Sequence, residues 1–224
     1  MGSVFDGRET RDHLAQLGLA APSLRGYYYE RGERRPSPQA SLLKERIIFL
    51  WDDIDDNLAE RVIMQLLYMQ SEDTTRDITL YINSHNGRVN AGLAIYDTMQ
   101  YIKSDVATYC VGATSGIGVL LLAGGAKGKR FCLPHSQVVF QQPASTAKGQ
   151  ANEVSIRARE AVRQQELFCE ILAKHTGKSS EEIQEDSDRR RYMTAQQAVE
   201  YGLVDEIITP DESGDRAWAK EGTK

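Results

Sequence analysis

Cysteine and long apolar segments are both scarce in this sequence. Its three cysteines, Cys110, Cys132 and Cys169, are an odd number, lie far apart and lack the spacing of a zinc site. They predict buried thiols in a reducing compartment, and no metal centre. The longest apolar segment, residues 117–126, is interrupted by glycine and falls short of the roughly 20 residues of a membrane span. We therefore expect no membrane contact.

An excess of positive charge is also lacking. The chain has 27 lysines and arginines against 32 aspartates and glutamates, which gives a formal net charge of −5. This composition does not indicate a basic surface that would bind nucleic acid. At 224 residues the chain suits a single hydrophobic core. Residues 1–40 show little periodicity and predict a largely extended arm, residues 41–209 predict the folded domain, and residues 210–224 predict a charged tail.

Strands and helices alternate along the folded domain. Strands are predicted at residues 46–51, 77–83 and 106–112, and the two helices between them are capped by Asp53 or Asp55 and by Asn90. Further strands are predicted at residues 131–133, 138–141 and 203–209, and the longest helix at residues 150–175, ended by Gly177. This alternation predicts an α/β domain with mainly parallel strands, whose functional loops lie at the strand ends.

Residues 107–128 form the most informative segment. A strand leads into a turn of small residues and then into an apolar helix, with the Ser115 hydroxyl and free backbone N–H groups at the turn. These are ingredients of acyl-transfer chemistry. The glycine-rich end of the segment departs from a phosphate loop at Ala123 and Arg130, so it favours a helix end with nearby cations over a nucleotide site.

Six segments carry a family resemblance, at residues 42–50, 80–84, 92–100, 125–130, 149–151 and 200–205. Together they closely resemble the proteolytic subunit of the Clp protease. The resemblance is collinear from about Arg31 to Thr209. It implies a ClpP/crotonase-like ββα spiral with a protruding handle helix at about residues 145–178, and an axial-pore loop at residues 31–34.

The resemblance also indicates where the family's catalytic residues would lie. The family's nucleophile turn is Gly-Gln-Ala-Ala-Ser-Met-Gly, and the matching residues 112–118 place Gly116 at the serine. Gln141 takes the place of the histidine and Arg190 that of the aspartate, whereas Gly87 and Ile117 match the oxyanion-hole positions. Glutamine is no general base, and a fixed cation replaces the orienting anion.

These departures predict a non-catalytic subunit of the ClpR type, found in plastids and cyanobacteria. It would join ClpP and ClpR paralogues in a two-ring hetero-tetradecamer, without a cofactor. The expected location is the plastid stroma, or alternatively a bacterial or cyanobacterial cytoplasm. The resemblance also implies a surface that docks a Clp AAA+ ATPase chaperone, with Thr79 as a polar departure. The matching residues are Tyr81, Tyr109, Val111, Phe131, Leu133 and Ile208.

Two alternatives stay open from the sequence. One is an active serine endopeptidase subunit that uses Ser115 as a displaced nucleophile. Ser115 would lie one residue from the expected position, about 100° around a helix axis, and would lack a base and an orienting acid. The other, less favoured, is a crotonase-type acyl-coenzyme A enzyme that shares the spiral fold.

Overall fold

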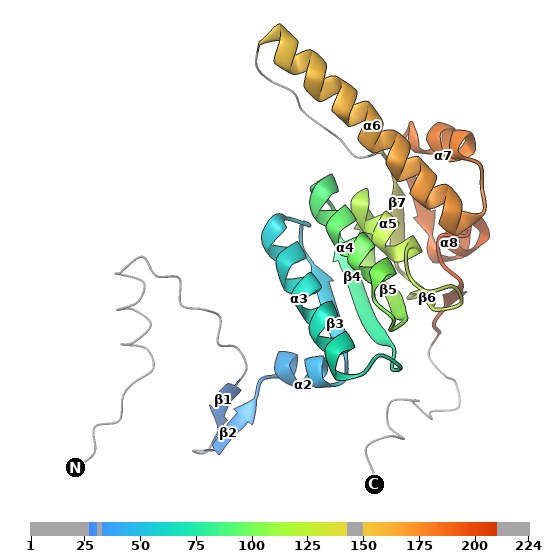
Figure 1. Ribbon diagram of the computed structural model, residues 1–224. Helices are drawn as coiled ribbons and strands as arrows, with labels where there is room; N and C mark the ends of the chain where they lie inside the picture. The colour runs from blue at the N-terminus through green and yellow to red at the C-terminus, as the bar shows by residue number, and fades with distance from the viewer. Residues whose placement is uncertain (1–26, 31–32, 143–149, 210–224) are drawn as a thin grey trace. The chain divides into compact units, whose positions relative to one another are not determined.

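The computed structural model describes residues 27–30, 33–142 and 150–209, which belong to two compact units, Met1–Glu45 and Arg46–Lys224 (Figure 1). In the first unit, β1 (Tyr27–Glu30) and β2 (Glu33–Pro36) pair antiparallel, and α2 (Pro38–Lys44) follows. The predicted extended arm therefore contains a hairpin and a short helix. Most of that arm (residues 1–26), part of the predicted pore loop (31–32), residues 143–149, which include the start of the predicted handle, and the tail (210–224) lie outside the described residues.

The second unit is built on a seven-stranded sheet in the order β3-β4-β5-β6-β9. These five strands pair parallel, as the alternation predicts. The last part of β5 turns to a different neighbour, β7, which pairs antiparallel with β8. The mainly parallel α/β class is confirmed. The strands are β3 (Ile47–Trp51), β4 (Ile78–Ser84), β5 (Val106–Ser115), β6 (Arg130–Cys132), β7 (Gln137–Phe140), β8 (Arg191–Thr194) and β9 (Glu206–Ile207).

Helices cover one face of this sheet. Figure 1 shows α3 (Asp56–Glu72) and α4 (Val89–Tyr101) side by side against β3, β4 and β5, followed by the apolar helix α5 (Ile117–Ala123). The side chains of β4 alternate between the face that the helices cover and the opposite face. Leu80 and Ile82 point to the covered face and are fully buried. The remaining helices are α6 (Ala151–Thr176), α7 (Ser180–Ser187) and α8 (Ala195–Tyr201).

Two local predictions fail because of long-range pairing. Helix α4 begins at Val89 rather than after Asn90, because the Arg88 N–H donates to the Ile54 carbonyl (2.8 Å) and so holds the chain extended up to Arg88. Strand β5 continues through Gly112 instead of ending there. Gly112 adopts φ 83°, and the Asn83 side chain accepts a hydrogen bond from the Ala113 N–H (3.2 Å), which carries the strand across the irregularity.

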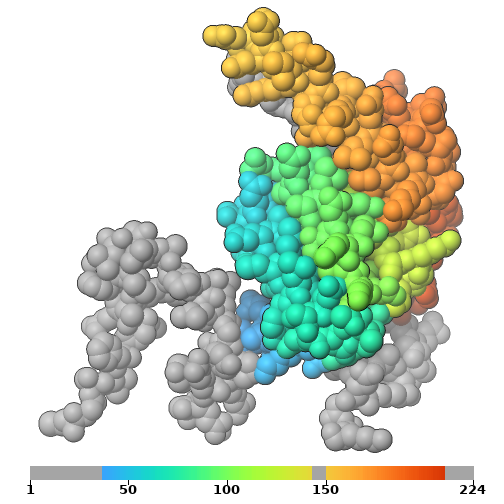
Figure 2. All heavy atoms as spheres, viewed as in Figure 1, coloured from blue at the N-terminus to red at the C-terminus, as the bar shows by residue number. Residues whose placement is uncertain are grey.

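Helix α6 is the longest helix among the described residues. Its buried residues, Phe168, Cys169 and Leu172, all lie in its second half. In the first half, Ile156 and Val162 are more than half exposed. Figure 2 shows this end of the helix projecting beyond the other coloured atoms. Gly177 ends the helix with φ 78°, as predicted. Within the described residues, no helix combines the length and the apolar character that crossing a membrane requires.

Candidate functional site

The turn between β5 and α5 is a sharp strand-to-helix elbow with Gly116 at its tip. Gly116 has φ 52° and ψ −122°, a conformation that L side chains rarely adopt. A Cβ atom built there would meet no heavy atom within 4 Å. The elbow therefore has room for a side chain at the position predicted to replace a catalytic serine, but it carries none.

Strand pairing brings Gln141 and Arg190, the other two positions predicted to match the triad, to the same edge of the sheet. Ser115 is in register with Val139 of the parallel strand β7, so Gln141 follows β7 close to where Gly116 follows β5. The antiparallel pairing of Phe140 with Arg191 places Arg190 opposite Gln141. The Arg190 Nε donates a hydrogen bond to the Gln141 Oε1 at 2.5 Å.

This amide–guanidinium pair has no acid–base chemistry near neutral pH. A glutamine amide does not take up a proton, and a guanidinium stays protonated under all ordinary conditions. Arg190 also donates to Gln141 through Nε, whereas a catalytic imidazole needs an acceptor for its second N–H. The contact therefore joins the end of β7 to the start of β8 and supplies no general base.

Ser115 points away from this edge. Its side chain is 4% exposed, and its Oγ donates a hydrogen bond to the backbone carbonyl of His85. His85 thus contributes its main chain, and no hydrogen bond joins its imidazole to the Ser115 hydroxyl among the described residues. Within the part of the chain that the structure describes, Ser115 has no side-chain base as a partner.

The predicted oxyanion-hole positions, Gly87 and Ile117, lie against each other. Gly87 forms an isolated parallel bridge with Ile54, which is anchored by the Ile54 N–H donating to the Asn86 carbonyl (3.0 Å). A Cβ at Gly87 would come within 2.7 Å of the Ile54 Cβ and 2.8 Å of the Ile117 Cγ2. Glycine is required here for close packing, and it keeps the two backbone segments next to the elbow.

The open face of the sheet carries a row of stacked aromatic rings. Tyr81 stacks on Tyr109 with a centroid distance of 5.0 Å, and Tyr109 contacts Phe131 at 4.8 Å, in line with their strand register. Burial raises the pKa of Tyr81 and Tyr109, so both remain neutral phenols at neutral pH. The structure thus brings together three of the six predicted docking residues as one continuous strip.

The other predicted docking positions lie within β5 or just after β6 and β9. The Leu133 N–H donates to the Cys110 carbonyl (3.1 Å) and the Ile208 N–H to the Cys132 carbonyl (2.9 Å), so both follow the strand ends. Val111, Leu133 and Ile208 are half-buried. Thr79 lies two residues before Tyr81 on β4, in register with Ile47 and Ala107.

Sequence reasoning missed two members of the aromatic strip. Phe49 stacks on Tyr81 at 5.5 Å and Trp51 contacts Phe49 at 6.3 Å, and both rings are 42% exposed. The signal was present in the sequence, because alternate residues of β3 share a face, and Phe49 and Trp51 alternate with the buried Ile48 and Leu50.

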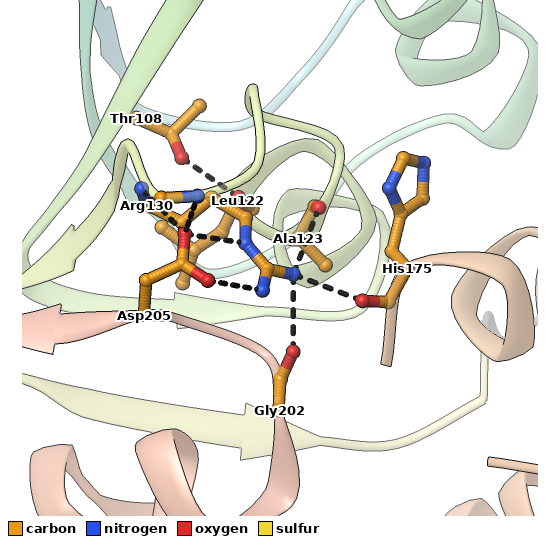
Figure 3. A network of polar contacts seen from close by, with 8 residues as sticks. Thr108, Leu122, Ala123, Arg130, His175, Gly202 and Asp205 are labelled. Carbon is orange, nitrogen blue, oxygen red and sulfur yellow. Dashed lines mark hydrogen bonds and ion pairs between the residues drawn. The ribbon is translucent and has the colours of Figure 1, made fainter. Parts of the chain in front are cut away.

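At the amino-terminal end of the sheet, Arg130 binds one carboxylate and three helix-end carbonyls (Figure 3). Its Nε and Nη2 donate to Asp205 at 2.9 and 2.5 Å. Its Nη1 donates to the carbonyls of Ala123 (3.4 Å), His175 (3.2 Å) and Gly202 (3.0 Å), which lie at or just beyond the ends of α5, α6 and α8. The predicted helix end with a nearby cation is thus confirmed, and the cation is Arg130.

The Arg130–Asp205 pair predicts a specific pH dependence of stability. Burial by itself raises the pKa of Asp205, but the hydrogen bonds and charge of Arg130 and the backbone N–H groups of Arg130 and Gly128 lower it below the ordinary 3.8. A carboxyl group whose pKa is lowered on folding stabilises the protein fully above its unfolded pKa, and this contribution is lost as the pH falls through the folded pKa. Asp205→Asn is therefore expected to cost about 3 kcal/mol at pH 7 and progressively less below pH 3.8.

Urea denaturation of both proteins between pH 2 and pH 7 measures this difference. Asp77→Asn is the control, because Asp77 makes an exposed contact with Lys129. A difference between wild type and Asp205→Asn that does not change with pH would contradict the prediction.

Among the described residues, no three histidine, cysteine, aspartate or glutamate side chains form a group that could hold a metal ion. The three cysteines are free and buried. In comparison with known proteins, a family model described as Clp protease matches residues 30–211.

Proposed function

This chain belongs to the Clp protease family, and we propose that it is a non-catalytic subunit, of the ClpR type, in an oligomeric proteolytic core. The observation that carries the proposal is the contact between Gln141 and Arg190, where a general base and its orienting acid would lie beside the elbow. Gly116 keeps the backbone of a nucleophile turn without a nucleophile. Losing all members of a triad leaves only the help of binding and of the oxyanion donors.

The hydrogen bond of the Ser115 hydroxyl argues against its use as a displaced nucleophile. Its hydroxyl is buried and donates to a main-chain carbonyl, and neither Gln141 nor Arg190 can take its proton. A serine without a base is a weak nucleophile at neutral pH. The alternative of an active endopeptidase that uses Ser115 therefore finds no support in the contacts around it.

Other surfaces suit a subunit that contributes to assembly. The projecting half of α6 exposes Ile156 and Val162, which fit the contact between two rings. The proposed assembly is a two-ring hetero-tetradecamer with ClpP and ClpR paralogues, in which this subunit forms part of the chamber wall. We place it in the plastid stroma, with a bacterial or cyanobacterial cytoplasm as the alternative.

The test is labelling with a fluorophosphonate, which reacts with activated serines. The purified full-length chain is expected to take up no label and to cleave no fluorogenic peptide above the buffer rate. Ser115→Ala is expected to behave like the wild type in both assays. Labelling of the wild type that disappears in Ser115→Ala would overturn the proposal in favour of the displaced nucleophile.

The aromatic strip predicts how the chain would dock a Clp AAA+ ATPase. Tyr81 stacks on rings at both sides, Phe49 and Tyr109, so Tyr81→Ala is expected to weaken ATPase binding by at least about tenfold, through loss of a central aromatic contact. Tyr101→Ala on α4, with a side chain that is 80% exposed, is the matched control and should leave binding unchanged. Surface plasmon resonance with the assembled core measures both. Equal affinities for the two variants would rule out this docking surface.

A further inference from the structure

A cavity of about 510 Å³ opens at the amino-terminal end of β5 and β6, the end opposite to Gly116. The end of α4, the loop of residues 124–127 after α5, and the end of α6 at residues 174–177 line it. Val106 and Arg130, the first residues of β5 and β6, complete the lining. This volume is in the range that accommodates small organic molecules.

The helix-end carbonyl groups around the cavity are already paired. Helix carboxyl termini carry a partial negative charge, which by itself would repel an anion. The carbonyls of Ala123, His175 and Gly202 accept hydrogen bonds from Arg130, as described above. The Gly124 carbonyl accepts one from the Gln100 Nε2 at 2.8 Å. These donors neutralise the acceptors that would otherwise favour a cation.

The charges that line the cavity leave a positive excess. Its one carboxylate, Asp105, shares Lys129 (3.0 Å) with Asp77 (2.6 Å), and Arg130 is paired with Asp205. Lys127 and Lys174, from the loop and from α6, form no ion pair with any residue that the structure describes. Two lysines on different walls therefore line the cavity, and neither has an ion-pair partner among the described residues.

His175 lies in this positive environment. It is half-buried, and its Nε2 lies 2.8 Å from the Tyr96 hydroxyl. Burial, followed by the charges of Lys174 and Arg130, lowers the pKa of His175 to about 4. The imidazole is therefore neutral at pH 7 and adds hydrogen-bonding capacity without adding charge.

Two amide groups of the glycine-rich loop are already paired and not available for an anion. The Ala126 N–H donates to the Val106 carbonyl (2.9 Å), and the Gly128 N–H donates to Asp205 (2.8 Å). A phosphate loop needs such amide groups free. Side chains are therefore the main groups available for recognition in this cavity, and Met99, Ile102 and Val106 supply an apolar part of the lining.

We propose that this cavity binds a small phosphate monoester, with its phosphate between Lys127 and Lys174 and its organic part against Met99, Ile102 and Val106. A phosphate monoester carries nearly two negative charges at pH 7, which matches two ammonium groups better than a single carboxylate does. The site is distinct from the triad-equivalent positions and does not depend on whether the chain is catalytic.

Isothermal titration calorimetry of the full-length chain with phenyl phosphate tests the proposal. We expect saturable binding of one molecule with a dissociation constant of about 1 mM or tighter. Phenol, which lacks the phosphate, and inorganic phosphate, which lacks the ring, are each expected to bind at least about tenfold more weakly. The affinity should also fall as the ionic strength rises.

Variants of the lysines locate the site. The double variant Lys127→Gln/Lys174→Gln is expected to weaken phenyl phosphate binding by at least about tenfold, because it removes both charges. Lys103→Gln is the matched control, since Lys103 is exposed nearby but does not line the cavity, and it should change the affinity less than about twofold. Ala126→Phe, which fills the cavity without altering charge, should also reduce binding.

Two results would overturn the proposal. One is the absence of saturable binding of phenyl phosphate up to about 10 mM, well above the expected dissociation constant. The other is binding that the double lysine variant and Ala126→Phe leave unchanged, which would place the ligand elsewhere. Thermal melts of each variant check that it remains folded.

Discussion

Replacing Arg130 with methionine is expected to lower the free energy of unfolding by about 3–5 kcal/mol, because it strands a partly buried carboxylate and frees three helix-end carbonyls. The Arg130 side chain is 7% exposed and that of Asp205 is 21% exposed, so water replaces the lost guanidinium poorly. For a chain of this size, such a loss corresponds to a decrease in melting temperature of about 10 °C. Urea denaturation and thermal unfolding followed by circular dichroism measure it.

The adjacent residue provides a matched control. Lys129→Met removes one positive charge and two ion pairs, to Asp77 (2.6 Å) and Asp105 (3.0 Å), but its side chain is 35% exposed. Exposed ion pairs contribute about 1 kcal/mol or less. If the two variants were destabilised to the same extent, the convergence of helix ends on Arg130 would not be what stabilises this part of the fold.

The triple variant Gly116→Ser/Gln141→His/Arg190→Asp is expected to gain peptidase activity, at least about a hundredfold above the parent chain. The elbow has open space at position 116, and positions 141 and 190 are already in side-chain contact. A histidine and an aspartate at those positions would recreate a base with its orienting acid. Hydrolysis of a fluorogenic peptide, and mass spectrometry of a fluorophosphonate adduct at position 116, measure the gain.

The double variant Gln141→His/Arg190→Asp is the control, because it restores the base without the nucleophile and should remain at the parent rate. The isolated chain is used for all three proteins, so that no active paralogue contributes. A triple variant that keeps the parent's melting temperature yet takes up no fluorophosphonate would show that positions 116, 141 and 190 are not a triad-equivalent set.

Local chemistry made several features of the fold predictable. Asp55 caps α3 by accepting the Leu58 N–H at 2.7 Å, and Thr194 and Gln197 form a capping box at the start of α8. Each of these signals involves residues three positions apart. By contrast, the start of α4 depends on Ile54, and the continuation of β5 depends on Asn83. No short window of sequence contains such partners.

The candidate site shows the same limit. The pattern around residues 112–118 predicts a strand, a turn and a helix, and the structure places Gly116 at that turn. Gln141 and Arg190 are 49 residues apart, and only the pairing of β7 with β8 brings them together. Composition and periodicity give no sign of that contact, and it was the resemblance to a family that singled out both residues. The Arg130–Asp205 pair, 75 residues apart, was missed for the same reason.

The backbone of Gly116 bears on how catalysis is lost and regained. A serine held at φ 52° and ψ −122° stores strain of about 1–3 kcal/mol, which glycine relieves because it lacks a Cβ. Exchange of a serine for glycine at this elbow therefore stabilises the fold while it abolishes the nucleophile. A change from serine to glycine at position 116 would therefore raise the free energy of unfolding, and the reverse change would lower it. In the proposed core, in which other subunits would cleave peptides, a glycine at this position would add stability to the fold without stopping proteolysis by the assembly.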